Sequence, residues 1–346
     1  MDLILKETRC TATMNKKRII FYNSILLIVL VIAFVTALIV GRYHISLNTF
    51  FKILFGGANR FPVESSIIVN LRLPRTLIAL FVGSALSLAG LVYQETFQNK
   101  LVSPDFLGVS GGASVGAALA IILGFSSMWL SGVAFIFGIG AMFLTITIAK
   151  IMRDHSPTIL ILSGIIVSSF MSATLSLLKY LAETESQLAT ITYWLMGSFE
   201  YSTMTDVYIL APIVVISSTI LFSIRWRINI VAQGPNEAQT QGLNYKLYRY
   251  IIIILATLIT ASSVAFAGVI GWIGLIVPHI VRLFVGKNTK HTIPLVLSFG
   301  AIFMIVTDIF SRTFTGAEIP LTAITGFLGA PIFVLILLRK RRIIND

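Results

Sequence analysis

The sequence predicts an all-α, polytopic membrane protein with about ten transmembrane helices and with both termini in the cytoplasm. Three observations carry this prediction: the apolar composition, the number of long apolar segments, and the uneven distribution of basic residues between the loops. Of the 346 residues, 56% are hydrophobic and only 12% are charged. That is about half the charged share of an average soluble domain, too little to cover a water-facing surface, so composition excludes a soluble enzyme.

Ten apolar segments are long enough, or nearly long enough, to cross a membrane. A membrane-spanning helix needs about 20 mostly apolar residues. Cutting the chain at charged, proline-containing and turn-like breaks leaves the segments 19–41, 73–93, 107–124, 129–149, 159–179, 207–224, 249–270, 272–284, 293–311 and 321–338. The eighth of them is short and interrupted, and such a helix is tolerated only inside protein or beside a cavity.

These segments define one transmembrane domain, 19–338, between an N-terminal tail, 1–18, and a C-terminal tail, 339–346. The first apolar run, from Ile19 to Val40, is longer than the core of about 7–15 residues found in signal peptides. We therefore expect it to be retained as the first span.

The net charge of +12 could indicate nucleic acid, anionic lipid, or the basic cytoplasmic loops of a membrane protein. The positions of the charges favour the third explanation, the basic cytoplasmic loops. Nineteen of the 26 lysines and arginines lie on the side that holds both termini and seven lie on the other side, whereas the 14 acidic residues divide evenly. The positive-inside rule places the first side in the cytoplasm, and nucleic-acid binding is excluded.

Glycines recur at helical spacing at the start of the third segment, at Gly108, Gly112 and Gly116. Small residues in register let helix backbones approach closely in lipid. They indicate tight packing between helices or, as the alternative, a movable pathway lined by this helix.

Ionisable residues within a bilayer would indicate proton or ion coupling, and the segments contain very few. Asp308 is the carboxylate that lies well inside a segment, and Arg312 follows one turn later, where an i,i+4 ion pair can form. We expect a structural ion pair near the outer surface rather than a proton relay. Any transport therefore takes its energy from elsewhere.

The longest internal cytoplasmic loop, 225–248, contains a short helix with signals at both ends. Pro235 suits a first helical turn and Gly242 suits a terminus. Such a helix is a good docking element for a soluble partner, although composition alone fits an inert surface loop equally well. On the outer side, Arg72 and Arg75 flank Pro74 and would be interfacial anchors by composition.

Several strings, taken together and in order, resemble one family. They are Arg72-Leu73-Pro74-Arg75; Gln94 and Asn99 followed by Ser103 to Ala113; Trp194 to Ser198; Glu237-Ala238 with Gly242-Leu243; Gly268 to Arg282, which includes Pro278-His279; and Asp308, Arg312, Glu318 to Pro320 and Gly329 to Pro331. Over residues 71–338 the chain resembles the FecCD-type permeases of ABC importers, which serve iron–siderophore complexes, haem and cobalamin.

This resemblance implies ten helices, a second permease subunit, identical or paralogous, and a location in the bacterial cytoplasmic membrane. It further implies a dimer of cytoplasmic ABC ATPases, which would bind ATP and Mg, and an extracytoplasmic substrate-binding protein. The chain itself would hold no cofactor and no metal, and would catalyse no reaction. It has no G-x-x-x-x-G-K-[ST] loop.

The resemblance also assigns candidate residues. The ATPase-coupling loop would be formed by Gly234, Pro235, Glu237, Ala238, Gln241 and Gly242. Arg72 and Arg312 would face outward and dock the binding protein, whereas Arg75, one turn deeper, would be structural. The pathway and its packing would involve Gly108, Gly112, Gly116, Pro278 and His279.

The cargo expected from the family is a metal chelate, most often a ferric siderophore, with cobalamin and haem as alternatives. The chain departs from the family pattern at Lys100, where a proline is common, and at Trp272, where phenylalanine is common. A different class of protein, an ion-coupled secondary transporter, also uses broken helices, but the shortage of intramembrane carboxylates disfavours it.

Overall fold

Every regular element that the computed structural model describes, in residues 16–152, 156–286 and 288–345, is a helix. Seven are long and apolar enough to cross a membrane. They are α2 (Lys16–Ile39), a continuous helix Pro62–Thr96 made of α4 (Pro62–Ser66), η3 (Ile67–Arg72) and α5 (Leu73–Thr96), and then α7 (Ser127–Ile151), α8 (Pro157–Leu181), α10 (Met204–Ser223), α13 (Tyr245–Ala267) and α15 (Thr289–Thr313).

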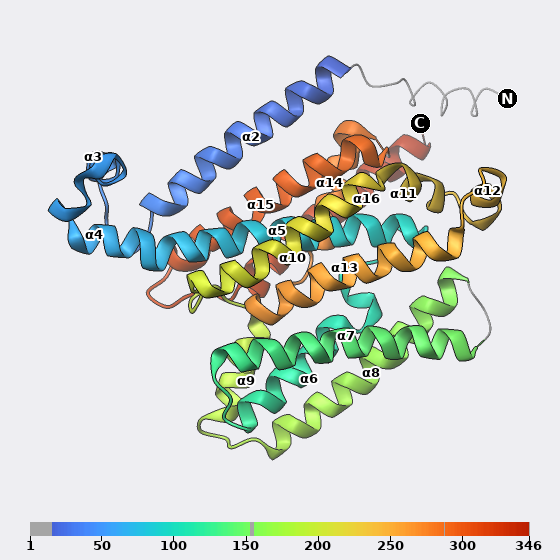
Figure 1. Ribbon diagram of the computed structural model, residues 1–346, viewed down its shortest axis with the longest axis horizontal. Helices are drawn as coiled ribbons and strands as arrows, with labels where there is room; N and C mark the ends of the chain where they lie inside the picture. Colours follow the sequence, from blue (N-terminus) through green and yellow to red (C-terminus); the bar gives the residue numbers. More distant parts are fainter. Residues whose placement is uncertain (1–15, 153–155, 287, 346) are drawn as a thin grey trace.

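Three helices with shorter apolar stretches complete the ten: α6 (Val109–Ile122), α14 (Ile273–Val285) and α16 (Leu321–Asn345), whose apolar part is Leu321–Ile336. The ten helices match the ten predicted segments in order, so the predicted fold class is confirmed. The helices lie along the long axis of the molecule, with α5 near the middle and α6, α7 and α8 together on one side (Figure 1).

Both short inner helices begin where the chain leaves helical geometry. A short turn, η4 (Pro104–Leu107), precedes α6 and ends at Gly108, whose φ of 77° is left-handed and suits glycine. Trp272, with a φ of 71°, precedes α14. The helices that follow have 14 and 13 residues, fewer than the roughly 20 of a full span, and most of their side chains are buried inside the protein, as predicted for the broken segment.

Four further helices lie at the two ends of the bundle: α3 (Leu47–Lys52), α9 (Gln187–Met196), α11 (Arg225–Val231) and α12 (Pro235–Thr240). In Figure 1, α12 lies at the same end as the start of α2 and the end of α16, whereas α3 and α4 lie at the opposite end. The start of α2 and the end of α16 thus lie at the same end of the molecule, as an even number of spans requires. This is the end that the sequence predicts to be cytoplasmic.

The helix α5 is the buried axis of the molecule, packed against α10, α13, α14 and α15. Its backbone touches two neighbours at glycines. A Cβ atom on Gly83 would overlap the carbonyl oxygen of Gly300, and one on Gly90 would overlap that of Gly274. Small residues at both crossings are therefore required for the observed packing.

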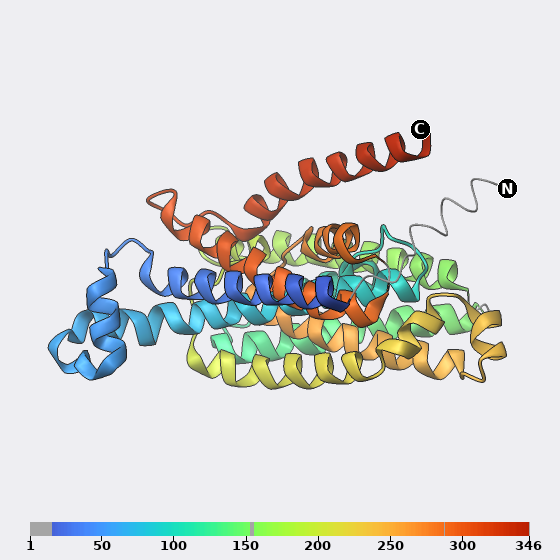
Figure 2. The same cartoon turned by 90° about the horizontal axis from the view of Figure 1, so that it is seen from above.

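The structure describes most of the predicted C-terminal tail and little of the N-terminal one. Most of the N-terminal tail, 1–18, lies outside the described residues. The C-terminal helix continues to Asn345 through residues that we expected to be a tail, because lysine and arginine are good helix formers. Figure 2 shows the later part of α16 leaving the bundle.

The α5–α14 crossing yields a stability prediction. We expect Gly90→Ala to destabilise the protein by about 1–3 kcal/mol, since the new methyl group forces the two backbones apart. Gly132→Ala is the matched control, because a Cβ there meets no atom within 4 Å. Thermal unfolding of the detergent-purified chain measures both. Equal midpoints for the two variants would show that the crossing is not tight.

Candidate functional site

A short capped helix lies at the cytoplasmic end, where the sequence predicted one. Gly234, with a φ of 105°, precedes α12, and Pro235 occupies the first turn. Ala238 is fully buried, while Glu237 beside it is exposed. The predicted coupling residues thus include one anchor, Ala238, and an exposed surface that carries Glu237.

The end of α12 is equally well defined. The side chain of Gln241 donates to Glu237 Oε1 at 3.2 Å, and the backbone N–H of Leu243 donates to the carbonyl of Ala238 at 2.8 Å. Gly242 is exposed, and a Cβ atom placed on it would meet no atom within 4 Å. The loop is therefore a folded element with a free outer surface.

The start of α12 lies against the end of α5. A Cβ atom on Gly234 would be 3.0 Å from Nε2 of Gln98, which lies just beyond the end of α5. The start of α12 is therefore close to the residues that follow α5.

Arg282, in the last turn of α14, fastens that helix to the same end of α5. Its Nη1 donates to Gln94 Oε1 at 2.5 Å and its Nη2 to Glu95 Oε1 at 2.8 Å. Gln94 in turn donates to the carbonyls of Gly274 and Leu275, at 3.3 and 3.4 Å. We call Gln94, Glu95 and Arg282 the inner clamp. The sequence alone did not predict this contact. The sequence offers one signal for it: Glu95 and Arg282, which carry opposite charges, lie at the cytoplasmic ends of two predicted segments.

A second charged cluster lies at the outer end. Arg75 Nε donates to Asp308 at 2.7 Å, and its two Nη atoms donate to the carboxylate of Glu318 at 2.6 and 2.9 Å. Arg312 Nε lies 3.3 Å from Asp308 Oδ2. The predicted Asp308–Arg312 ion pair is confirmed, as is a structural role for Arg75. The cluster joins α5, α15 and the loop before α16.

Arg72 and Arg312 do not face outward. They are 5% and 6% exposed, so our expectation of two solvent-facing docking arginines is wrong about their exposure. Instead they bond the outer end of α2. Their acceptors are the carbonyl oxygens of Ala37, Leu38, Ile39 and Tyr43, at 2.6–2.9 Å. The last carbonyls of a helix lack partners within it, and leaving them bare in an apolar setting costs several kcal/mol.

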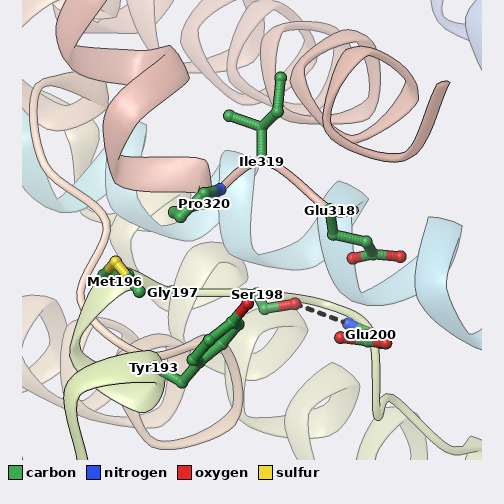
Figure 3. A pocket seen from close by; sticks show the side chains of 8 residues that line it. All are labelled: Tyr193, Met196, Gly197, Ser198, Glu200, Glu318, Ile319 and Pro320. Atoms are coloured by element: carbon green, nitrogen blue, oxygen red, sulfur yellow. Dashed lines mark hydrogen bonds between the residues drawn. The ribbon is translucent and has the colours of Figure 1, made fainter. Parts of the chain in front are cut away.

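A small pocket opens at the outer end between the loop after α9 and the loop before α16 (Figure 3). Tyr193, Glu200, Glu318 and Pro320 are among its lining residues, and its cavity volume is about 10 Å³. Sites that enclose drug-sized ligands have about 300–1,000 Å³. The pocket is too small to enclose a large chelate within this one subunit.

The remaining predicted residues lie where helices pack. A Cβ atom on Gly112 would be 2.5 Å from the carbonyl oxygen of Phe137 in α7, and one on Gly116 would be 2.8 Å from Phe137 Cβ. Pro278 is buried in α14, and the ring of His279 meets Phe333 of α16 edge-on, with centroids 5.6 Å apart. These contacts support the packing explanation, and the pathway role of these residues stays a prediction.

The chain matches the model of the FecCD transport family over residues 28–339. It is 37% identical to the molybdate import system permease MolB of Haemophilus influenzae, over 92% of this chain and 95% of the relative. It is 34% identical to a probable iron chelatin transport system permease of Helicobacter pylori (90% and 96%). It is also 34% identical to the vitamin B12 import permease BtuC of Citrobacter koseri (79% and 83%).

Two solved structures superpose on this chain. A transporter assigned to the metal-chelate type of ABC transporter, in an inward-facing conformation, superposes with a TM-score of 0.85 at 36% identity, over 92% of this chain and 98% of the other. PsaBC of Streptococcus pneumoniae, solved with a Fab, superposes with a TM-score of 0.57 at 19% identity, over 76% and 90%, and shares the fold.

The outer cluster makes a stability prediction. Asp308→Ala leaves the arginines around it without their buried counter-charge, so we expect a loss of about 3–5 kcal/mol. Thermal unfolding of the purified chain measures it. The control, Glu200→Ala, removes an exposed carboxylate from the same end and should change stability by less than about 0.5 kcal/mol. A stable Asp308→Ala protein would contradict the structural role of the cluster.

Proposed function

The chain belongs to the FecCD transport family, and we propose that it imports a metal chelate, most simply a ferric siderophore, by alternating access. As a member it is the permease subunit of an ABC importer, a multi-pass protein of the inner membrane that is not itself catalytic. A permease of this kind works with an ATPase and with a binding protein. In the proposal, a partner ATPase dimer binds ATP and Mg, and the binding protein delivers the chelate from outside.

The observation that carries the proposed coupling is the position of α12. Its buried Ala238 anchors it, its Glu237 is exposed at the cytoplasmic end, and the residue before its first turn, Gly234, lies against Gln98 beyond α5. A cytoplasmic partner that moves α12 therefore moves the end of the buried axis.

The inner clamp extends this coupling to α14. Arg282 bonds the last turn of α14 to α5, and Gln94 bonds its first turn. In the proposal, a displacement of α5 is therefore passed to this short helix. The pair of Arg282 and Glu95 is nearly buried, with side chains 7% and 17% exposed. In the proposed cycle this clamp keeps α5 and α14 moving as one body.

The cargo proposal rests on what the relatives transport. Among them are permeases named for iron chelatin, for vitamin B12 and for molybdate, and the structural match at 36% identity is of the metal-chelate type. A chelated metal fits most of these names. Molybdate is the competing cargo, because the relative named for it is 37% identical over 92% of this chain. Cobalamin, for which a relative is also named, and haem, which only the family resemblance suggests, are the further alternatives.

A second permease copy would complete the pathway. Large apolar side chains on α16 are exposed in the single chain, among them Phe327 at 82% and Leu335 at 65%. Lipid or another subunit must cover them, and the pocket in one chain is too small for a chelate. We propose that two copies, or this chain and a paralogue, enclose the pathway between them.

The function is tested by uptake into proteoliposomes that contain the permease, its ATPase and its binding protein. We expect ATP-dependent uptake of a ferric siderophore, tested beside molybdate, cobalamin and haem. Glu237→Arg should abolish most of that uptake without loss of membrane insertion, since it reverses a charge on the exposed surface of α12. Thr184→Arg, exposed in an outer loop, is the control. Uptake driven by an ion gradient without nucleotide would refute the proposal.

The clamp is tested by exchanging its charges. Arg282→Glu places two carboxylates together and should lower ATP-driven uptake about tenfold or more, consistent with the cost of breaking a nearly buried pair. The double variant Glu95→Arg/Arg282→Glu restores opposite charges and should recover much of the loss. A double variant no better than the single one would show that the ion pair itself is not needed.

A further inference from the structure

The helix α11 lies at the level where the span α10 ends. The span has 20 residues, or about 30 Å at 1.5 Å per residue, which matches the hydrocarbon core of about 30 Å. Only Ile224 separates the two helices, and Figure 1 shows α11 near α12 at the predicted cytoplasmic end. The first residues of α11 therefore lie at the level of the headgroups of the cytoplasmic leaflet.

The helix α11 is held firmly against the bundle. Its residues Ile228, Ile230 and Val231 are buried. The carbonyl oxygen of Arg225 accepts from the hydroxyl of Thr289, at the start of α15, at 2.6 Å. The side-chain oxygen of Asn229 accepts from the backbone N–H of Thr289 at 3.0 Å. The outer surface of α11 is therefore presented in one orientation.

That surface combines basic and aromatic side chains. Trp226, between Arg225 and Arg227, is 63% exposed. The guanidinium of Arg225 lies 4.2 Å from the ring centroid of Phe222 and donates to the carbonyl of Phe222 at 2.8 Å. The guanidinium of Arg227 lies 4.9 Å from the ring of Tyr248 in α13. We call these five residues the cytoplasmic collar, in which cation–π contacts orient both arginines.

The positive charge of the cytoplasmic collar is not neutralised from within the chain. Arg75 and Arg282 form ion pairs with carboxylates, whereas Arg225 and Arg227 form none with the residues that the structure describes. The stretch 207–236 contains no acidic residue. Two arginines in fixed positions are thus available to an anion from outside the chain.

We propose that the cytoplasmic collar binds the headgroup of an anionic phospholipid in the cytoplasmic leaflet. The end of α10 brings the arginines to the level of the lipid phosphates, and a guanidinium offers a phosphate a planar fork of donors. Basic residues close to the membrane surface attract anionic lipids. Exposed aromatic rings such as that of Trp226 are typical of this boundary, where they meet headgroups and the first part of the acyl chains.

The test measures binding of phosphatidylglycerol to the delipidated, detergent-purified permease by native mass spectrometry, with zwitterionic phosphatidylcholine as the reference. Arg225→Gln/Arg227→Gln should lower the affinity for phosphatidylglycerol about tenfold or more and that for phosphatidylcholine less than about twofold, because only the first headgroup carries a net charge. Arg225→Lys/Arg227→Lys keeps both charges and should retain the affinity within about threefold.

The matched control is Arg42→Gln/Arg60→Gln, which removes two exposed basic residues from the outer end and should change the affinity for phosphatidylglycerol less than about twofold. The collar variants should fold, because the bonds between α11 and α15 use the carbonyl of Arg225 and the side chain of Asn229. An unchanged midpoint of thermal unfolding checks this.

Three outcomes would overturn the proposal. The first is equal affinity of the glutamine variant and the unchanged chain for phosphatidylglycerol. The second is displacement of the lipid by inorganic phosphate, which would assign the arginines to a soluble anion. The third is unchanged lipid binding with loss of the ATPase from the permease–ATPase complex, which would assign them to that partner. None of these measurements uses the cargo, so a failed uptake assay does not affect them.

Discussion

The close approach of α5 to α14 and α15 is the constraint on which the rest of the structure depends. In a membrane, helices gain little from burying apolar surface against one another, because lipid is just as apolar. Association then depends on backbones that come close, and Gly83 and Gly90 provide this at the contacts with Gly300 and Gly274. Because α5 is buried along its length, the elements around it are positioned by these crossings.

Both ends of this axis are fastened by arginine. At the outer end, Arg75 joins Asp308 and Glu318, and Arg72 bonds the carbonyls that end α2. At the inner end, Arg282 bonds Gln94 and Glu95. A guanidinium suits this role because it offers five donors in a planar fork. Arginines that resemble surface anchors in the sequence thus hold the helices together.

The two ends of the molecule present different surfaces. The cytoplasmic end presents α12, whose start contacts Gln98 just beyond α5. At the outer end, the stacked rings of Phe51 and Phe55 and the basic side chains of Arg42, Lys52 and Arg60 are exposed. Between them lies α5, a buried helix with few ionisable groups.

The sequence by itself determined the ten apolar helices, the cytoplasmic side, the capped helix at 235–240 and the Asp308–Arg312 pair. These depend on hydrophobic period, loop charge, and spacing along one helix, all of which are local. The family followed from motif order alone. The position of α12 against Gln98 could not be predicted, because it depends on segments that lie far apart in the chain.

Only the tertiary structure decided which charges are free. Arg72 has the same local pattern whether it faces water or the end of α2, and the difference is made by a helix more than 30 residues earlier. Arg75 and Glu318 are 243 residues apart in the chain, yet they form a bidentate pair. Burial and ion pairing are properties of the packed helices. The sequence therefore determines which residues carry charge, and the fold selects the ones that can meet a partner.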